Sequence, residues 1–460
     1  MSTQIRDTAI PTGEPDDKPL GRPQLVTFRQ AFWFWFKLGF ISFGGPAGQI
    51  AIMHTELVER RRWISERRFL HALNYCMLLP GPEAQQLATY IGWLLHRTWG
   101  GVVAGGLFVL PSLFILIGLS WVYVAWGDVP VIAGLFYGIK PAVTAIVLHA
   151  AHRIGSRALK NPVLWSIAAA AFVAIFAMEL PFPLIVASAA LIGFLGGKRW
   201  PECFQVGSRH GSNSQGYGPA LIDDDTPSPT HARFRWSRLI WIVAAGVALW
   251  AAPMAILSAV YGWQGAYTQM GWFFTKAAYL TFGGAYAVLP YIYQGAVDHY
   301  GWLTPIQMID GLALGETTPG PLIMVVAFVG FVGGYAHGLL GPEHLFVAGA
   351  LAAAVVTWFT FLPSFLFILA GGPLVEATKE DLKFTAPLTA ITAAVVGVIL
   401  NLAVFFGYHV LWPAGLAGRF DLGSALIALG AAIALFRFKR GVIEVIAACA
   451  VIGLIVKLTL

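Results

Sequence analysis

Charged residues are scarce in this chain, and their scarcity argues against a soluble globular protein. Only 11% of the 460 residues are Asp, Glu, Lys or Arg, against about 25% in soluble proteins. Three stretches contain none of the four: 98–127, 239–275 and 345–375. Each exceeds the roughly 20 apolar residues that a helix needs to cross a bilayer. The sequence therefore predicts an all-α polytopic membrane protein.

Cysteines are also few, and Cys76, Cys203 and Cys449 lie far apart with no CxxC spacing. They form neither a disulfide framework nor a metal cluster, so we expect no metal site and no cofactor. No Gly-Lys-Ser/Thr phosphate loop occurs, so ATP is not the expected energy source. The net charge of +6 is typical of Lys and Arg gathered in cytoplasmic loops. It does not indicate a nucleic-acid partner, and we expect membrane lipid instead.

The chain repeats itself at an offset of 239 residues. Within an ungapped window, 33–82 against 272–321, twelve of fifty positions are identical. The identities are concentrated in Gly, Pro, Trp and Lys rather than in interchangeable aliphatic residues. Further along, Leu-Pro-Ser at 110–112 recurs at 362–364 with a different offset. The chain therefore consists of two homologous halves.

One apolar segment between the halves has no partner in the repeat, and it sets their relative orientation. An unpaired crossing inverts the second half relative to the first, which is the plan of many secondary transporters. The positive-inside rule agrees, and it places the N-terminus in the cytoplasm and the C-terminus in the periplasm. We expect a cytoplasmic tail (1–28), a first transporter repeat (29–197), a polar cytoplasmic linker (198–238), an unpaired transmembrane helix (239–260) and a second, inverted repeat (270–460).

The first two apolar segments, 29–58 and 69–96, are each too long for one crossing. Each has a break near its middle, Phe-Gly-Gly-Pro (43–46) in the first and Pro-Gly-Pro (80–82) in the second. As single crossings, they would place the basic cluster 60–68 outside, against the charge rule. As re-entrant hairpins, they return to their starting side and the cluster lies inside. Two kinked crossings with one exceptional loop are the alternative.

The four breaks, two in each half, predict an anion site. A helix that starts near the bilayer centre exposes unpaired backbone N–H groups and about half a positive charge. Glycine lets the backbone approach a ligand, and proline at the first helical position has no N–H to leave unpaired. These residues can also serve only packing and kinking, but their pairing by the repeat favours a site. The expected substrate-binding residues are Phe43, Gly44, Gly45, Pro80, Gly81, Pro82, Gln85, Gln86, Phe282, Gly283, Gly284, Thr317, Thr318, Pro319, Gly320 and Pro321.

Two lysines and two glutamates add charge to these segments. Lys37 and Lys276 are repeat partners, and together they would neutralise a divalent anion bound within the membrane. Intramembrane charges are costly and usually functional, although a lysine can also extend to the interface. Glu83 and Glu316 flank the Pro-Gly-Pro breaks. They are candidates for proton coupling or for helix capping.

The paired motifs resemble the chromate ion transporter family in its long, two-domain form. The resemblance rests on Phe-Gly-Gly at 43–45 and 282–284, on a Trp after each first segment, and on Pro-Gly-Pro at 80–82 and 319–321. It covers about residues 30–455. It implies export of chromate across the bacterial inner membrane, with sulfate as a competing analogue.

Other substrates and a membrane-embedded enzyme are the alternatives to chromate transport. The sequence does not distinguish chromate from sulfate or another oxyanion. A repeat of broken helices favours alternating access, driven by the membrane potential or the proton motive force. A membrane-embedded enzyme would need a nucleophile–base pair or a carboxylate–histidine cluster. The sequence offers neither, so we expect no catalytic residues and no enzyme. The oligomeric state stays open, a homodimer included.

Overall fold

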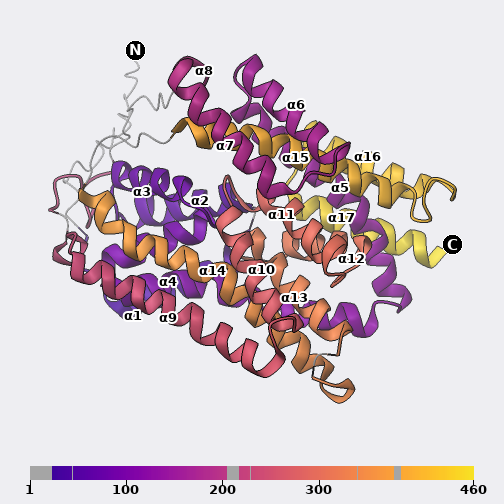
Figure 1. Ribbon diagram of the computed structural model, residues 1–460, viewed down its shortest axis with the longest axis horizontal. Helices are drawn as coiled ribbons and strands as arrows, with labels where there is room; N and C mark the ends of the chain where they lie inside the picture. Colours follow the sequence, from indigo (N-terminus) through magenta and orange to yellow (C-terminus); the bar gives the residue numbers. More distant parts are fainter. Residues whose placement is uncertain are drawn as a thin grey trace, which may run out of the picture.

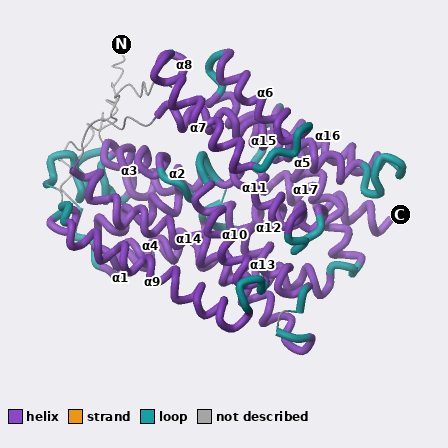
Figure 2. Tube along the Cα trace, viewed as in Figure 1, coloured by secondary structure: helices purple, strands orange, loops and turns teal. Residues whose placement is uncertain are grey.

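The computed structural model describes residues 23–43, 45–204, 217–227, 229–338, 340–377 and 385–459. In this part of the chain helices predominate, as Figure 2 shows. The only β-pairing among these residues is an isolated bridge between Ile64 and Ile222. Seven helices are long and apolar enough to cross a membrane. The prediction of an all-α polytopic membrane protein is confirmed.

The two halves contain the same helices in the same order. The first half comprises α1 (Phe28–Ile41), α2 (Gly45–His54), α3 (Glu66–Leu78), α4 (Glu83–Trp126), α5 (Pro130–Ala158), α6 (Pro162–Phe176) and α7 (Phe182–Arg199). The short α8 (Pro201–Phe204) and the unpaired α9 (Trp236–Tyr261) follow. The second half comprises α10 (Ala266–Leu280), α11 (Ala285–Tyr293), α12 (Pro305–Thr317), α13 (Val325–Ala336), α14 (Leu345–Ala377), α15 (Thr385–Leu411), α16 (Leu422–Phe436) and α17 (Val442–Thr459).

The element α4 is two helices joined by a sharp turn. His96 and Arg97 have non-helical backbone angles, and Arg97 has a positive φ of 56°. The second arm folds back on the first, so that a Cβ on Gly92 would lie 2.5 Å from the Cβ of Ala104. In the second half α13 and α14 make the same turn, and a Cβ on Gly334 would lie 2.7 Å from the Cβ of Ala352. Small residues at these contacts let the helix backbones approach closely.

The segments that carry the breaks fold back as hairpins. After the first break the chain returns to α1, where the rings of Phe34 and Trp63 lie 4.9 Å apart. Around the second break, Arg68 on α3 and Tyr90 on α4 reach the same carboxylate, that of Glu376. The helices α3 and α4 also pack against each other. The chain therefore folds back at these breaks, as the hairpin interpretation predicts, and its return to the same side of the membrane stays a prediction.

The halves interlock through their later helices. In the first half α5 packs against α16 and α17, while α15 of the second half packs against α6 and α7. The unpaired α9 runs along one side of the molecule against α10 and α14 (Figure 1) and is largely exposed. An apolar, largely exposed helix is suited to contact with lipid.

The described part of the linker is docked rather than free. Asp224 accepts a hydrogen bond of 2.6 Å from the hydroxyl of Ser65, and Arg68 donates to the carbonyls of Asp223 and Thr226. Nε2 of His231 lies 2.9 Å from the carbonyl oxygen of Trp93, and burial lowers the pKa of this histidine. Asp223 through its carbonyl and Asp224 through its carboxylate thus fasten the linker to the start of α3, while Asp224 stays exposed.

Candidate functional site

The first break in each half ends a helix in the same way. The hydroxyl of Ser42 donates to the carbonyl of Leu38 at 2.6 Å, and its repeat partner Thr281 donates to Ala277 at 2.7 Å. The next helix then starts at a glycine with positive φ, 67° at Gly45 and 97° at Gly284. Only glycine adopts such angles without steric cost, so the sequence dictates the break.

The second break is built by Pro-Gly-Pro. Gly81 and Gly320 have φ of 129° and 104°, and the residue before a proline is disfavoured in the helical region. Pro82 and Pro321 then precede the next helical residues, Glu83 and Leu322. Each motif therefore stops one helix and starts another within a few residues.

The two kinds of break meet across the halves. The N–H of Gly81 in the first half donates to the carbonyl of Thr281 in the second, at 2.7 Å. The N–H of Gly320 in the second half donates to the carbonyl of Ser42 in the first, at 2.8 Å. Since both pairs are related by the 239-residue offset, the crossing is symmetric. We call these two hydrogen-bonded junctions the crossovers.

Each crossover lies next to two helix starts, one from each half. One brings the start of α4 to that of α11, and the other brings the start of α2 to the 3₁₀ turn Leu322–Met324 that leads into α13. This turn also contacts α4 and α11. The first-turn N–H groups of a helix have no partner within it, and their partial positive charges add up. The arrangement can hold a small anion without any metal ligand.

Space for a ligand exists beside the first breaks. A Cβ added to Gly45 or Gly284 would meet no atom within 4 Å. The Pro-Gly-Pro turns are crowded instead: a Cβ on Gly320 would lie 2.8 Å from the Cβ of Ser112. Gly283 is exposed, and Phe43 and Phe282 are half-buried beside these turns. Gly44 lies outside the described residues.

The expected amide and hydroxyl donors are engaged within the protein, although each glutamine amide keeps a second N–H. Nε2 of Gln85 donates to Thr89 at 3.0 Å, and that of Gln86 donates to the carbonyl of Pro80 at 2.8 Å. The hydroxyls of Thr317 and Thr318 both donate to the carbonyl of Leu314. A hydroxyl has a single hydrogen, so neither threonine offers one to an anion in this conformation. Their proposed role in binding stays a prediction.

Neither lysine reaches the crossovers. Lys37 is exposed on α1, opposite the face that buries Phe34, Trp35 and Leu38. Lys276 is half-buried, and its ammonium lies 5.7 Å from the ring centroid of Trp272. Contact with the membrane interface is compatible with both positions, and anion binding by these lysines stays a prediction.

The two glutamates sit where the sequence predicts, beside the Pro-Gly-Pro turns. Glu83 is the first residue of α4. Glu316 is 9% exposed at the end of α12 and accepts a hydrogen bond from the hydroxyl of Tyr286. Tyr286 belongs to the first turn of α11, so this bond ties the two breaks of the second half together. No signal in the sequence points to Tyr286, because its repeat partner is Ala47.

Comparison with known proteins places this geometry in a family. The sequence profile of the chromate transporter family matches residues 29–194 and 268–454, one match for each half. The chain belongs to the chromate transporter family. It is 32% identical over 401 residues to the chromate transport protein of Pseudomonas aeruginosa, covering 87% of this chain and 86% of that one. It is 29% identical over 433 residues to that of Cupriavidus metallidurans, covering 93% of each. No solved structure matches it.

Two serines near the breaks carry no functional signal in the sequence. Ser112 and Ser364 belong to the repeated Leu-Pro-Ser, a pattern that predicts only the repeat. Each lies against a Pro-Gly-Pro turn of the opposite half. A further residue without a signal in the sequence is Gln49, whose Nε2 donates to the carbonyl of Gly320 at 2.5 Å.

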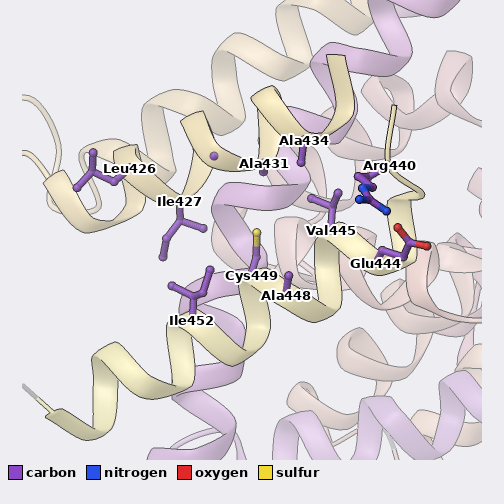
Figure 3. Close-up of a pocket in the computed structure, with 11 residues that line it drawn as sticks. Leu426, Ile427, Ala431, Ala434, Arg440, Glu444, Val445, Ala448, Cys449 and Ile452 are labelled. Carbon is purple, nitrogen blue, oxygen red and sulfur yellow. The ribbon is translucent and has the colours of Figure 1, made fainter. Parts of the chain in front are cut away.

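A separate groove lies between α16 and α17, with a volume of about 520 Å³ (Figure 3). Its eleven lining residues are apolar except for Arg440 and Glu444, and none comes from the breaks. An apolar groove on lipid-facing helices does not offer the converging donors that an oxyanion needs.

Proposed function

We propose that this protein exports chromate from the bacterial cytoplasm across the inner membrane by alternating access. The proposal is supported by its family and by relatives that are named chromate transport proteins. The observation that carries it is the pair of crossovers, in which Gly81 bonds to Thr281 and Gly320 bonds to Ser42. Each crossover pairs a positive helix start of one half with one of the other half, which suits binding of an oxyanion. Sulfate or another tetrahedral oxyanion is the alternative substrate.

Inverted halves are a common basis of alternating access, and helix packing supports inversion here. Along α4 and α14, which are repeat partners, Gly101 faces Leu369 while Gly105 faces Phe365. Along α5 and α15, Gly155 faces Val396 while Thr144 faces Gly407. Residue numbers rise on one helix as they fall on the other, so the partners run antiparallel at both contacts. Equivalent helices run in opposite directions when the repeats are inverted.

Neighbouring loops support the same orientation. The first hairpin, with its basic cluster 60–68, packs beside the linker through Ile64 and Ile222. The corresponding turn of the second half packs beside the loop before α7, where Gln294 accepts from the N–H of Phe182 and donates to the carbonyl of Leu180. We therefore place the linker and the basic cluster in the cytoplasm and the loop before α7 in the periplasm.

Labelling of repeat partners tests the inversion. Arg67 and Ile306 are such partners, and both are exposed. We expect Arg67→Cys to react with an impermeant maleimide only from the cytoplasmic face, and Ile306→Cys only from the periplasmic face. The background chain has Cys76, Cys203 and Cys449 replaced, and intact cells are compared with everted vesicles. Reaction of both cysteines from one face would rule out inversion.

Two buried ion pairs join the halves at opposite ends. Arg68 on α3 lies 2.7 Å from Glu376 on α14, which also accepts a 2.6 Å hydrogen bond from Tyr90. At the other end, Asp310 on α12 accepts a 2.8 Å hydrogen bond from Tyr123, on α4 of the first half. Lys140 lies 3.4 Å from the same carboxylate oxygen. We propose that the two clusters open in turn as the site faces one side and then the other.

Removing the ion pair of Arg68 and Glu376 should lower the stability of the folded protein. The side chains of Arg68 and Glu376 are 11% and 5% exposed, and removing one member of a buried pair costs about 3–5 kcal/mol. We expect Arg68→Ala to lower the thermal stability of the purified protein clearly. Arg67→Ala is the matched control, because its side chain is exposed, and it should leave stability unchanged. Equal melting temperatures for both variants would show that the pair does not hold the halves together.

Chromate accumulation in cells tests the function itself. Cells that express the protein should accumulate less chromate than cells without it, and added sulfate should reduce the difference if both anions use one site. Greater accumulation in the expressing cells would reverse the proposed direction. Equal accumulation, with the protein present in the membrane, would reject chromate transport.

A further inference from the structure

Two buried serines at equivalent places have hydroxyls that the protein does not use. Ser112 and Ser364 each follow a proline inside a long helix, Pro111 in α4 and Pro363 in α14. Each side chain is about 1% exposed. Neither hydroxyl has a hydrogen-bond partner among the described residues. A buried polar group without a partner is costly, so its presence at both repeat positions calls for a reason.

Several other hydroxyls near the breaks are satisfied within their own helix. Ser42, Thr281 and Thr360 donate to the carbonyl four residues earlier, which is the usual way to satisfy a hydroxyl in a membrane helix. Ser112 and Ser364 do not. Each therefore keeps its one hydrogen for another acceptor.

Both serines lie against the crossovers. A Cβ on Gly320 would lie 3.2 Å from Oγ of Ser112, and a Cβ on Gly81 would overlap Oγ of Ser364. The N–H groups of the same two glycines form the crossovers. Each serine thus faces the turn that starts a helix in the opposite half. A hydroxyl donor at this place would bind an anion together with the N–H groups at the helix starts.

We propose that the hydroxyls of Ser112 and Ser364 donate hydrogen bonds to the oxygen atoms of the transported oxyanion. This inference rests on the proposed function and names two residues of its site. Every oxygen of a tetrahedral oxyanion such as chromate is an acceptor, so one serine from each half contributes a donor on its side. The bound anion then satisfies the two hydroxyls that the protein leaves unpaired.

Alanine substitution tests the serines, because Ser112→Ala and Ser364→Ala remove little more than the donor. We measure initial chromate uptake by everted vesicles over a range of concentrations. A hydrogen bond to a charged group is worth about a tenfold change in affinity or more, so each variant should raise KM by about tenfold. The control is Ser120→Ala, which removes another buried, unpartnered hydroxyl from α4. Its KM should equal that of the wild type.

A second readout separates binding from packing. Loss of an unpartnered hydroxyl should not lower the melting temperature of the purified protein, but it should reduce the rise in melting temperature that added chromate produces. Unchanged KM and an unchanged chromate-induced rise in both alanine variants would overturn the role of the serines while chromate transport by the wild type stands. A wild type that neither transports nor binds chromate would overturn the proposed function instead.

Discussion

Leucine in place of Gly45 or Gly284 is expected to stop chromate transport while the protein still inserts into the membrane. Both glycines start a helix at a crossover, and a Cβ on either would point into open space. A leucine side chain would fill the place where an anion approaches the first-turn N–H groups. Each loss of about 1.4 kcal/mol in binding free energy lowers the affinity for the anion about tenfold. A side chain that excludes the anion altogether should lower the affinity by more than tenfold. Uptake by everted vesicles, normalised to protein abundance, measures the effect.

Backbone strain could produce the same loss without any ligand, and a third glycine controls for it. Gly301 also has a positive φ, 61°, and open space around its Cβ position, but it lies in the turn before Trp302. A non-glycine residue in the left-handed region costs about 1–2 kcal/mol, and Gly301→Leu carries that cost away from the crossovers. We expect this variant to transport normally. Equal loss in all three variants would assign the effect to strain, and near-normal transport by Gly45→Leu would leave the glycine a packing role.

The repeat and the breaks could be read from the sequence because their causes are local. Glycine permits a positive φ wherever it occurs, and the proline after Gly45, Gly81 and Gly320 disfavours a helical conformation of the glycine before it. Gly45, Gly81, Gly284 and Gly320 therefore mark the breaks before any contact is known. The hairpins can also be predicted from segment length, because a segment that is too long for one crossing and broken in its middle is expected to bend. Charge distribution then favours a return to the same side.

The crossovers could not be predicted in the same way. The bond from Gly81 to Thr281 joins residues 200 positions apart, and no local pattern specifies which carbonyl a turn meets. For the same reason Ser112 and Ser364 were visible only as a repeated Leu-Pro-Ser. Lys37 is a different case. Its charge within an apolar segment predicts a ligand, and the structure places it on the exposed face of α1, so its role in binding stays a prediction.

The membrane potential should suffice to drive export. A dianion that leaves a cell with a negative interior gains roughly 4.6 kcal/mol per 100 mV, twice the value of about 2.3 for one charge. At about 1.4 kcal/mol per tenfold ratio, this supports an outward gradient of about three decades. We therefore expect everted vesicles to accumulate chromate when a potassium diffusion potential makes their interior positive, without ATP and with competition from sulfate.

Two further arms of this experiment separate the energy sources. If protons are exchanged as well, an imposed pH gradient should change the uptake, and Glu83→Gln or Glu316→Gln should abolish that change while leaving the response to the potential. Tyr286→Phe is the matched variant for Glu316, because it removes only the hydrogen bond to that carboxylate. Vesicles without the protein correct for leakage of chromate. Uptake that ignores the potential and requires added ATP would refute the mechanism, because a carrier of this kind moves a dianion down its electrical gradient and must respond to the sign of the field.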